Sequence, residues 1–497
     1  MKVLIVGSGA REHALALMMA RSSSEPRIYV ASDYANPGLS RVAEESGGKL
    51  MIARSSDPEA VARVAEAVSP DLVVIGPEEP QFAGVADELR RRGFTVFGAG
   101  RRCAEIERSK VFARELMWRH SIPGRLYFAA FRSVEEAREF SRFAGEVVIK
   151  PARQAGGKGV RVLSGYRAYL HEDYEEMARR SIESVASGVM KSYSDTKYTV
   201  LVEQLVEGVE YTATLITDGS YHLPLPLAQD HPHAFDFDIG PETGGMGSIS
   251  GPGWLLPFIE RGEFERSVEI VRRAVEALQS EVGERYVGAI AGQMMLTGLW
   301  GPTVIEFYSR FGDPEIANLL PVVESDMLEI LDAAASGRLA SKKLEIDETR
   351  AVVVKAVAPA GYPLRKSLGK GHPIAVDEAR ARELGCVVLY GSVEMRGSEM
   401  VTRGSRAIEI VCTASSHEEA ARLANRVAAE CVRSLDGWPL FFRSDIGTSR
   451  LLSKRVELAQ RVRRVYRSKE AAGTLGEFYV WVPGKGFFSN PILARGR

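Results

Sequence analysis

Two lysines and three glycines lie close together in the stretch VIKPARQAGGKGV, residues 148–160. Lys150 ends a short apolar run, and Lys158 lies inside the run Gly156-Gly157-Lys158-Gly159. Glycines expose backbone N–H groups to an anion and the lysines add positive charge, so the stretch suits nucleotide phosphates. The alternative interpretation is a hairpin turn with a solvated lysine. Lys150 favours the first interpretation, because a lysine at the inward end of an apolar strand needs an anionic partner.

A second candidate site lies in the stretch YVGAIAGQMMLTGLWGPTVIEFY, residues 286–308, which predicts two strands joined by a turn. If the turn is centred between Leu299 and Trp300, the numbers of two facing residues sum to 599, and Gln293 faces Glu306. Tyr308 then lies on the same face as Glu306, two residues along the strand. An amide oxygen and a carboxylate on one surface are suitable Mg²⁺ ligands for phosphoryl transfer. The alternative interpretation is a half-buried Glu306 paired with Arg310.

Two further segments carry groups that could hold substrates. The segment RFGDPE contains Arg310 and Asp313, and its arginine could bind a carboxylate or phosphate through two hydrogen bonds. A long polar segment at 230–253 begins with Asp230 and contains the run Gly244-Gly245-Met246-Gly247. This glycine-rich run could close over a small anion through its backbone N–H groups, or it could act as a flexible lid.

The N-terminal turn predicts a competing nucleotide site. Gly7-x-Gly9 follows a strand, as in many dinucleotide sites, and Asp33 could accept a ribose hydroxyl, so an NAD-dependent oxidoreductase is one alternative. Glu12 stands where that fingerprint has glycine or alanine, which favours a tight turn or a phosphate-ester pocket. His231 and His233 could bind a metal, but histidines in a turn-rich loop more often face solvent.

Composition places these residues in a folded protein of several domains. The chain has 497 residues, which is too long for one hydrophobic core. Its hydrophobic and charged contents, 45% and 26%, are ordinary, and a net charge of −1 argues against a nucleic acid or an anionic membrane as partner. No apolar run is long enough for a membrane span or a signal peptide, so the sequence predicts a cytoplasmic protein.

The four cysteines lie far apart and have no CxxC spacing. This spacing argues against a zinc site and against a disulfide framework. We therefore expect reduced thiols at Cys103, Cys386, Cys412 and Cys431.

The elements that must position these residues change character along the chain. Four apolar runs that alternate with helical patterns predict a doubly wound parallel sheet, at 3–6, 28–31, 71–76 and 94–98. Strands of more antiparallel character follow, at 147–150, 159–164, 199–204, 210–217 and 221–229. A loop is expected over 230–253, and helices over 262–281 and from about Pro314. Beyond residue 340, short strands and one amphipathic helix predict a small α/β domain without catalytic clusters.

Eight motifs occur in a fixed order along the chain. They are GSGAREHA, GPEEP, ERSK, AGGKGV, VEQLVEGVE, AQDH, GPETGGMG and VIEFYSRFGDPE. In this order the chain resembles the phosphoribosylamine-glycine ligase family, also called glycinamide ribonucleotide synthetase, of the ATP-grasp superfamily, and its archaeal forms look most similar. The resemblance covers about residues 1–445. It implies a multidomain α/β and α+β protein with an N-terminal doubly wound parallel sheet, a central ATP-grasp fold and a small C-terminal α/β domain.

The resemblance also implies a division of the chain into four parts. A Rossmann-like substrate domain is expected at 1–103, and an ATP-grasp domain at 104–335 with a mobile lid at about 125–198. A C-terminal domain is expected at 340–445, followed by a basic extension at 446–497.

The activity implied by the resemblance is ATP-dependent ligation of glycine to 5-phosphoribosylamine, the second step of de novo purine biosynthesis. Glycyl phosphate would be the intermediate, and glycinamide ribonucleotide, ADP and phosphate the products. The implied cofactors are ATP and Mg²⁺ or Mn²⁺. The implied partners are small molecules rather than nucleic acid or membrane, and the protein would be a monomer or a homodimer.

Residues that match the family's motifs receive its roles. Nucleotide binding is implied for Lys110, Lys150, Gly156, Gly157, Lys158, Gly159, Glu203, Gln204, Leu205, Val206 and Glu210. Metal binding is implied for Gln293 and Glu306. Substrate binding is implied for Gly9, Glu78, Asp230, Gly244, Gly245, Met246, Gly247, Arg310 and Asp313. Arg310 would hold the glycine carboxylate and Asp230 its ammonium, and these two residues and Lys158 are the expected catalytic residues.

Four residues depart from the family pattern where chemistry is expected. Tyr308 stands at the position of a metal-binding Asn, Glu242 at that of another Asn, Arg108 at that of a Gly, and Pro232 at that of a basic residue. A phenol is a poor Mg²⁺ ligand at neutral pH because its pKa is about 10. Either other groups compensate and the ligase works, or the chain is a paralogue with other substrates or an ATP-binding protein without turnover.

The tail from Leu451 to Arg497 carries ten Lys/Arg against three Asp/Glu. Its basic helical stretch predicts either a solvated face or a surface that docks on an acidic partner. The stretch GEFYVWVPGKGFF predicts a hairpin with apolar sides, buried against the body of the protein or an interface.

Overall fold

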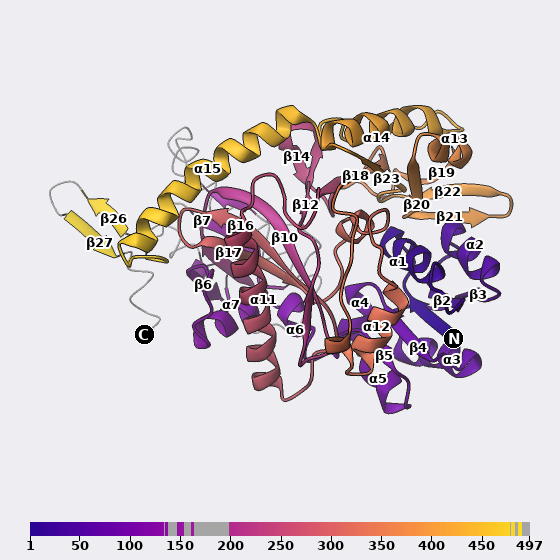
Figure 1. Ribbon diagram of the computed structural model, residues 1–497, viewed down its shortest axis with the longest axis horizontal. Coiled ribbons are helices and arrows are strands. Elements are labelled where there is room, and N and C mark those ends of the chain that lie inside the picture. Colours follow the sequence, from indigo (N-terminus) through magenta and orange to yellow (C-terminus); the bar gives the residue numbers. More distant parts are fainter. Residues whose placement is uncertain are drawn as a thin grey trace. The chain divides into compact units, whose positions relative to one another are not determined.

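The computed structural model describes residues 1–133, 135–137, 147–153, 161–163, 198–477, 479–482 and 486–489. The chain forms two compact units. Figure 1 labels helices and strands along the chain. The first unit comprises Met1–Ala104, Tyr211–Gly292 and Tyr308–Val456, and the second comprises Glu105–Glu210, Gln293–Phe307 and Glu457–Arg497. The predicted phosphate-binding residues Gly156, Gly157, Lys158 and Gly159 lie outside the described residues.

A five-stranded parallel sheet forms the N-terminal part of the first unit, in the order β3-β2-β1-β4-β5. The strands are β1 (Lys2–Val6), β2 (Arg27–Ser32), β3 (Lys49–Ile52), β4 (Leu72–Ile75) and β5 (Val96–Phe97). Val3 and Ile5 share a core with α1 (Ala10–Ala20) and α2 (Pro37–Glu45). Leu4 and Val6 share another with α3 (Pro58–Val68) and α5 (Val85–Arg91). Helices cover both faces, which confirms the predicted doubly wound sheet. The local pattern did not predict β3, because its four residues are half-buried or exposed and form no apolar run.

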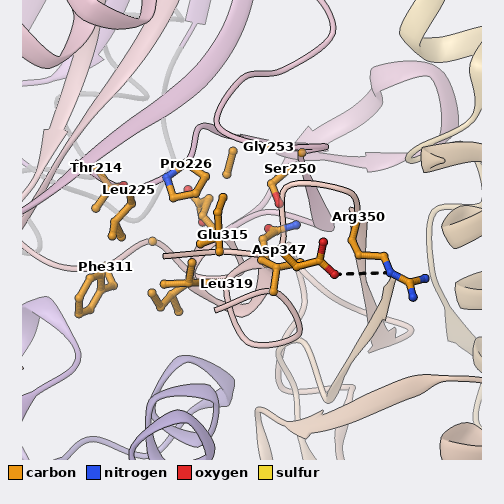
Figure 2. A pocket seen from close by; sticks show the side chains of 17 residues that line it. Thr214, Leu225, Pro226, Ser250, Gly253, Phe311, Glu315, Leu319, Asp347 and Arg350 are labelled. Carbon is orange, nitrogen blue, oxygen red and sulfur yellow. Dashed lines mark ion pairs between the residues drawn. The ribbon is translucent and has the colours of Figure 1, made fainter. Parts of the chain in front are cut away.

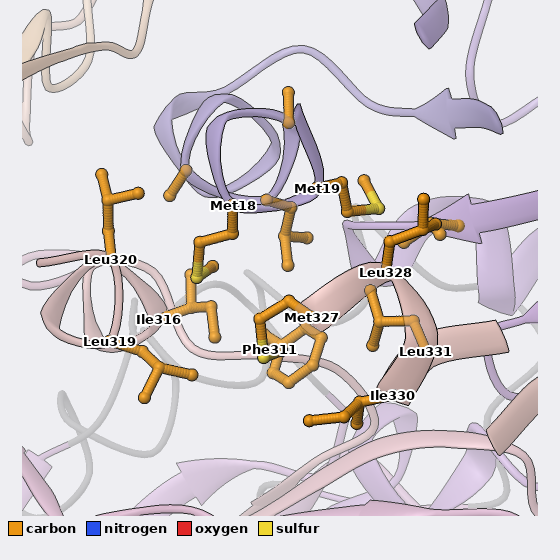
Figure 3. Close-up of a cluster of buried hydrophobic side chains, with 14 of the residues drawn as sticks. Met18, Met19, Phe311, Ile316, Leu319, Leu320, Met327, Leu328, Ile330 and Leu331 are labelled. Atoms are coloured by element: carbon orange, nitrogen blue, oxygen red, sulfur yellow. The ribbon is translucent and has the colours of Figure 1, made fainter. Parts of the chain in front are cut away.

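The larger core of the first unit joins α1 to the segment that contains RFGDPE. Met18 and Met19 of α1 lie against Phe311 and against the side chains of η2 (Glu315–Asn318) and α12 (Met327–Ala335) (Figure 3). Phe311 also stacks on Phe97, with ring centroids 5.7 Å apart. This core fixes the backbone on both sides of Arg310 and Asp313. The helix expected from about Pro314 is a single 3₁₀ turn, and α12 begins twelve residues later than η2.

A second sheet of the first unit is antiparallel and has the order β10-β12-β15-β18-β23-β20. Its strands are β10 (Gly208–Thr217), β12 (Ala228–Asp230), β15 (Gly247–Ser250), β18 (Ala351–Pro359), β23 (Ile408–Ala414) and β20 (Cys386–Tyr390). The single strand expected at 221–229 is divided into β11 (His222–Pro224) and β12, because Pro224 and Pro226 cannot donate ladder hydrogen bonds. β25 (Leu440–Phe441) pairs with β18.

The segment expected to be a loop, 230–253, is largely ordered into short elements, and that expectation is wrong. After β12 it forms β13 (His233–Phe235), η1 (Asp236–Asp238) and β14 (Ile239–Glu242), and it then enters β15. β13 and β14 pair as a hairpin. Asp238 at the corner of this hairpin pairs with Arg443 and Arg455. These arginines follow Asp238 by more than 200 residues in the chain, so the local sequence pattern could not reveal the support.

The chain from 352 to 456 completes the first unit. A small antiparallel sheet has the order β21-β22-β19-β24, with β19 (Lys370–Val376), β21 (Val393–Arg396), β22 (Glu399–Arg403) and β24 (Val432–Ser434). The remaining helices of the unit include α4 (Glu78–Ala83), α11 (Arg261–Val282), α13 (Glu378–Glu383) and α14 (His417–Cys431). The predicted helix at 262–281 and the amphipathic helix near the C-terminus are both confirmed.

Cys386 and Cys412 form a disulfide, so the prediction that all four cysteines are reduced is wrong for these two. They are directly opposite each other on the antiparallel strands β20 and β23, with their Cα atoms 4.4 Å apart. This separation lies within the range that a disulfide requires. The other two cysteines, Cys103 and Cys431, are buried thiols.

The second unit contains a four-stranded antiparallel sheet in the order β6-β9-β7-β8. The strands are β6 (Phe128–Phe131), β7 (Val147–Pro151), β8 (Arg161–Leu163) and β9 (Val200–Gln204). Two helices precede this sheet in the chain, α6 (Glu105–Arg108) and α7 (Lys110–Arg119). The elements that come later in the chain are β16 (Gly288–Thr297), β17 (Gly301–Tyr308), α15 (Ser449–Ala471), β26 (Tyr479–Val482) and β27 (Gly486–Ser489). The expected antiparallel character of this part is confirmed. β10, β16, β17 and α15 each have residues in both units.

Candidate active site

A cluster of alternating charges lies in the second unit and contains both predicted phosphate-binding lysines that the structure describes. Lys110 Nζ lies 3.1 Å from Oε1 of Glu306, and Lys150 Nζ lies 4.0 Å from the same oxygen. Lys150 Nζ also lies 2.8 Å from Oε2 of Glu203. Lys110 is placed by helix α7, whose first turn is capped by the Ser109 hydroxyl accepting a hydrogen bond from Phe112 N. The predicted need of Lys150 for an anionic partner is confirmed.

Glu203 is the buried centre of this cluster, with a side chain that is 1% exposed. Besides Lys150 it accepts a hydrogen bond from Nε of Arg114, whose other end bonds the carbonyl of Ile305. Burial alone would raise the pKa of Glu203, but the charges of Arg114 and Lys150 outweigh it and lower the pKa to about 2. The carboxylate therefore stays ionised and orients Lys150. Arg114 was not singled out in the sequence, where it is one of several charges on a helix.

The connection between β9 and β10 carries the other predicted nucleotide-binding residues. Leu205 and Val206 are half-buried and belong to neither strand, and Glu210 accepts a long hydrogen bond of 3.5 Å from Gln293 Nε2. The Oε1 atom of Gln204 is buried and receives no hydrogen bond from any described residue. An unpaired buried acceptor at this point suits a donor group of a ligand.

The predicted metal ligands Gln293 and Glu306 lie on neighbouring strands, β16 and β17. Burial raises the pKa of Glu306, but Lys110 and Lys150 lower it below its ordinary value, so an ionised oxygen ligand is present. Gln293 is 5% exposed and offers an amide oxygen. These donors fit Mg²⁺ or Mn²⁺ in a site where phosphates complete the coordination. Among the described residues, no group of three or more His, Cys, Asp or Glu side chains could hold a metal by itself.

The predicted register of the β16–β17 hairpin is wrong at its turn. The hydroxyls of Thr297 and Thr303 lie 2.8 Å apart, so these residues share a face. Numbers that sum to 599 would pair Thr297 with Pro302 and would send Thr303 to the other face. The turn spans three residues between the strands rather than two or four, which the sequence pattern did not reveal. The direct facing of Gln293 and Glu306 stays a prediction.

A second group of charges lies in the first unit and contains Arg11, Glu78 and Arg310. Nε of Arg310 donates to Oε2 of Glu78 at 3.1 Å, and Nη1 of Arg11 lies 3.8 Å from the same oxygen. Both arginines also donate to the carbonyl of Phe311 at 3.2 Å. Burial raises the pKa of Glu78, but Arg310 and Arg11 outweigh it and lower the pKa. Two arginines share one carboxylate, so this group can still accept an anion from a substrate.

Glu12 fills the turn that could have held a dinucleotide. Its Oε2 accepts a hydrogen bond from Gly9 N at 2.7 Å, and its Oε1 pairs with Arg11 at 2.7 Å. A side chain at Gly7 or Gly76 would overlap Glu12, which explains why glycine occupies both positions. The buried carboxylate would repel a pyrophosphate. The N–H of Gly9 thus donates to Glu12 rather than to a substrate. Substrate binding by Gly9 stays a prediction.

Asp33 is also engaged within the protein. Its carboxylate accepts hydrogen bonds from Ser55 N at 3.0 Å and from the hydroxyls of Ser55 and Ser8 at 2.6 and 3.2 Å. The side chain stabilises the turn after β1 rather than presenting itself to a ribose. The structure therefore gives no support to the NAD-dependent alternative.

Glu315 is a buried acid of the first unit that is under the electrostatic influence of Asp230. Burial and the charge of Asp230 raise the pKa of Glu315 to about 7. Glu315 accepts a hydrogen bond from the Thr212 hydroxyl at 3.4 Å and lines a pocket with about 30 Å³ of space for water-sized molecules (Figure 2). The figure shows Glu315 among Leu225, Phe311 and Leu319, with the ion pair of Asp347 and Arg350 farther along the pocket. An ammonium group beside these acids would restore the ionised form of Glu315.

The glycine-rich run from Gly244 to Gly247 is held by hydrogen bonds. Gly244 N donates to the Tyr362 hydroxyl at 3.0 Å, Gly245 N to the Thr243 hydroxyl at 3.0 Å, and Met246 N to the carbonyl of His231 at 2.8 Å. Gly247 pairs with Lys355 in the β15–β18 ladder. Anion binding through free N–H groups of Gly244, Gly245 and Met246 therefore gains no support, and the role of the run as a lid stays a prediction. Substrate contact by these residues in another way stays a prediction.

Asp313 lies against Arg406 and Glu409, two residues that were not predicted from the sequence. Nη2 of Arg406 lies 2.7 Å from Oδ2 of Asp313, and Glu409 is 1% exposed beside them. The pKa of Glu409 is raised well above its ordinary value by burial and by the charge of Asp313. Both residues come from the part of the chain expected to lack catalytic clusters. No local motif marks them, because their partner is some ninety residues earlier in the sequence.

Tyr308 and Arg310 lie together in the first unit. The guanidinium carbon of Arg310 is 4.6 Å from the centre of the Tyr308 ring. A cation over an aromatic face is attracted by the ring's negative face. The Tyr308 ring thus stabilises the guanidinium of Arg310. A phenol is a poor metal ligand, so this contact does not compete with metal binding.

The predicted alternative of a histidine metal site gains no support. His231 is buried, and its Nδ1 receives no hydrogen bond from any described residue. Burial and the nearby Arg443 lower the pKa of His231 to about 3, so the ring is neutral. His233 Nδ1 lies 3.1 Å from the carbonyl of Gly240, within the β13–β14 hairpin.

In the described part of the chain no helix is both long and apolar enough to cross a membrane.

Three family models match successive parts of the chain. They are the N domain of phosphoribosylglycinamide synthetase at residues 1–107, its ATP-grasp (A) domain at 108–316 and its C domain at 352–449. The ATP-grasp model covers the segments that bear the lysine and glutamate cluster. The C-domain model covers Arg406 and Glu409.

Named relatives match along almost their whole length. The phosphoribosylamine–glycine ligase of Methanopyrus kandleri is 41% identical over 466 residues, which are 93% of this chain and 99% of the relative. That of Pyrococcus horikoshii is 39% identical over 463 residues, 93% and 98% of the two chains. The crystal structure of the Thermotoga maritima enzyme superposes with a TM-score of 0.71 at 25% identity, covering 90% of this chain and 100% of that one. The predicted N-terminal parallel sheet, ATP-grasp domain and C-terminal domain are confirmed, and the chain belongs to the phosphoribosylglycinamide synthetase family of ATP-grasp carboxylate-amine ligases.

Proposed function

We propose that this protein ligates glycine to 5-phosphoribosylamine at the expense of ATP, giving glycinamide ribonucleotide, ADP and phosphate. The relatives that match over almost their whole length bear the name of this ligase. The observation that carries the proposal is the approach of Lys110 and Lys150 to the ionised carboxylate of Glu306. Two cations and one oxygen ligand are the groups that phosphoryl transfer from a metal-bound nucleotide requires.

In the first step a carboxylate oxygen of glycine attacks the γ-phosphorus of ATP, and ADP leaves. Both reactants are anions, so Lys110 and Lys150 bind phosphate oxygens and reduce the repulsion. Glu203 and Arg114 hold Lys150 in place. Gln293 and Glu306 would hold Mg²⁺ or Mn²⁺, which supplies further positive charge to the phosphates. Gln204, with its unpaired buried oxygen, would accept a hydrogen bond from the nucleotide base.

In the second step the amine nitrogen of 5-phosphoribosylamine attacks the carbonyl carbon of glycyl phosphate. The carbon–oxygen bond to phosphate breaks, phosphate leaves with the bond electrons, and the nitrogen loses a proton as the amide forms. Arg310 would bind the glycine carboxylate before transfer, and Asp230 its ammonium. No nucleophilic side chain is needed, because the acyl phosphate is itself reactive. The same reactivity requires that water be kept from the intermediate.

A second candidate function is that of a related ligase that joins another carboxylate to another amine. The observation that favours it is the place of Tyr308 beneath Arg310, where the family pattern has a metal-binding Asn. A change at this position could alter the number of metals or the shape of the carboxylate site. The substrates named above remain the first choice because the identity to the named ligases extends along 93% of the chain.

The test is ADP release by the purified protein with ATP and Mg²⁺. Glycine and freshly generated 5-phosphoribosylamine are added separately and then together. We expect ADP release only when both are present, with one glycinamide ribonucleotide formed per ADP. ATP binding without release under any of these conditions would refute the ligase, and a screen of other amino acids and amines would then follow.

A further inference from the structure

The C-terminal part of the first unit contributes side chains to the segments that carry predicted substrate residues. Three residues make these contacts, Tyr362, Arg406 and Glu409. They contact the glycine-rich run that begins at Gly244, or the carboxylate of Asp313. The mechanism above assigns no role to any of the three.

Arg406 joins two segments that are far apart in sequence. Its Nη1 lies 2.8 Å from the carbonyl of Gly244, 2.9 Å from that of Gly245 and 2.8 Å from that of Asp313. Its Nη2 lies 2.7 Å from Oδ2 of Asp313. The guanidinium is 13% exposed, so these protein groups largely replace its water. One planar cation thus sets the distance between the glycine-rich run and the RFGDPE segment.

Glu409 completes the surroundings of Asp313. Oε2 of Glu409 and Oδ1 of Asp313 are both buried, and neither accepts a conventional donor from any described residue. Burial and the neighbouring charge of Asp313 raise the pKa of Glu409 well above its ordinary value, which favours a protonated Glu409. The pKa of Asp313 is lowered, because the charges of Arg406 and Arg11 outweigh its burial. Asp313 therefore stays ionised, and Arg406 fixes the orientation of its carboxylate.

Tyr362 acts on the same run from its N–H side. Its hydroxyl accepts the hydrogen bond of Gly244 N at 3.0 Å, while Arg406 binds the carbonyl of Gly244. Both polar groups of one glycine are thus held by the C-terminal part of the chain. A Cβ atom at Gly245 would lie 2.9 Å from Pro314, so the run and the RFGDPE segment are also in close contact.

We propose that Arg406 is a positioning residue of the ligase, which holds the carboxylate of Asp313 and the glycine-rich run in the geometry that the glycine site requires. Glu409 and Tyr362 complete this support. The inference rests on the proposed function, since it takes these two segments to be parts of the glycine site. Its consequence is that the C-terminal part contributes to substrate affinity as well as to the stability of the fold.

A purely structural role makes a different prediction. If Arg406 only stabilised the unit, its loss would lower the melting temperature and reduce the amount of active enzyme, leaving each Michaelis constant of the folded fraction unchanged. A positioning role instead changes the response to glycine and leaves the response to ATP as it was, because the predicted nucleotide residues belong to the second unit.

The experiment compares Arg406→Met, Arg406→Lys and the control Arg396→Met with the wild type. Met keeps most of the side-chain volume without charge, whereas Lys keeps the charge but cannot span several acceptors. Arg396 is a partly exposed arginine of the same region that pairs with Glu394. For Arg406→Met we expect kcat/KM for glycine to fall roughly 10- to 100-fold, as for loss of a buried charged hydrogen-bond network, with KM for ATP within about 2-fold. Arg406→Lys should be intermediate, and Arg396→Met should resemble the wild type.

Hydrogen exchange of the backbone provides a readout that does not depend on activity. In Arg406→Met we expect faster exchange in peptides that contain residues 243–247, and no such change in Arg396→Met. Equal loss of activity toward glycine and ATP, or unchanged glycine kinetics with unchanged exchange, would overturn the positioning role. If the wild type releases no ADP with both substrates, the proposed function fails. Unchanged exchange in Arg406→Met would separately refute the claim that Arg406 holds the glycine-rich run in place.

Discussion

The guanidinium of Arg310 lies over the ring of Tyr308, 4.6 Å from the ring centre, and its Nε donates to Glu78 at 3.1 Å. The position of Tyr308 belongs to a metal-binding Asn in the family pattern. In this chain the side chain stabilises the arginine that we place at the glycine carboxylate. We therefore expect that tyrosine at this position weakens the predicted metal site and strengthens the predicted anion site at Arg310.

Substitution of Tyr308 separates these two effects. Tyr308→Phe keeps the ring, so we expect KM for glycine to stay within about 2-fold of the wild type. Tyr308→Asn removes an attraction of about 0.5–2 kcal/mol and should raise KM for glycine by roughly 2- to 30-fold. It should also lower the Mg²⁺ concentration that gives half-maximal activity, because an amide oxygen is a better ligand than a phenol. An Asn variant with unchanged glycine and Mg²⁺ titrations would remove both ideas.

Lys150 should affect both stability and nucleotide affinity. Lys150→Met leaves Glu203 with Arg114 as its remaining cation, and we expect a loss of about 1–3 kcal/mol in the free energy of unfolding and a rise in KM for ATP. The double variant Lys150→Met/Glu203→Gln should recover part of the stability, because it removes the poorly compensated charge. It should not recover ATP affinity. Recovery of both would mean that Lys150 only neutralises Glu203.

Glu315 should give the protein a pH-dependent stability between about pH 4.5 and 7. Its pKa is raised from 4.5 to about 7 by burial and by Asp230, so the folded state binds a proton that the unfolded state has lost. The contribution of this group is present in full below pH 4.5 and is lost as the pH rises through 7. In Glu315→Gln the decrease in the free energy of unfolding between about pH 4.5 and 7 should be smaller than in the wild type by about 1–3 kcal/mol. Urea unfolding at several pH values measures this difference. Parallel pH curves for the two proteins would contradict the shift.

The disulfide between Cys386 and Cys412 should stabilise the C-terminal part of the first unit. It closes a loop with a sequence separation of 26, which corresponds to about 3 kcal/mol of unfolding free energy in the chain-entropy model. Cys386→Ser/Cys412→Ser should show this loss in urea, and reductant should destabilise the wild type but not the variant. Cys103→Ser is the control, since Cys103 is a buried thiol outside the loop. Equal urea midpoints with and without reductant would exclude a stabilising bond.

The basic tail is partly buried, and its removal should destabilise the protein. Gly476 N donates to the carbonyl of Leu299, and Tyr466 packs against Gly301, both at the turn between β16 and β17. Nearer its start the helix α15 places Arg450 over the ring of Phe237, at 4.7 Å. These contacts favour docking on the body of the protein over the solvated face.

We expect truncation after Ser449 to lower the melting temperature by several degrees, roughly as for loss of a few buried side chains. Tyr466→Ala should give part of that effect, and Arg464→Ala, at an exposed position of the same helix, should give almost none. Unchanged stability and unchanged oligomeric mass after truncation would contradict the buried contacts.

The strands and helices near the chemistry could be predicted from local patterns. Apolar runs followed by glycine predicted β1 and β4, and the position of Lys150 at the end of an apolar strand predicted an anionic partner. Local patterns failed where support comes from distant residues. The segment 230–253 was expected to be a loop because Arg443 and Arg455, which hold its corner, lie some two hundred residues away.

The sequence by itself determined the family, the parallel N-terminal sheet and the residue types for phosphoryl transfer, because these depend on ordered motifs and on local periodicity. The tertiary structure alone decided which charges meet. It placed Arg114 and Lys150 on Glu203, Tyr308 under Arg310, and Cys386 opposite Cys412. It also brought Arg406 to Asp313. Such pairs depend on strand order and on burial, and neither is encoded in the spacing of the residues that it brings together.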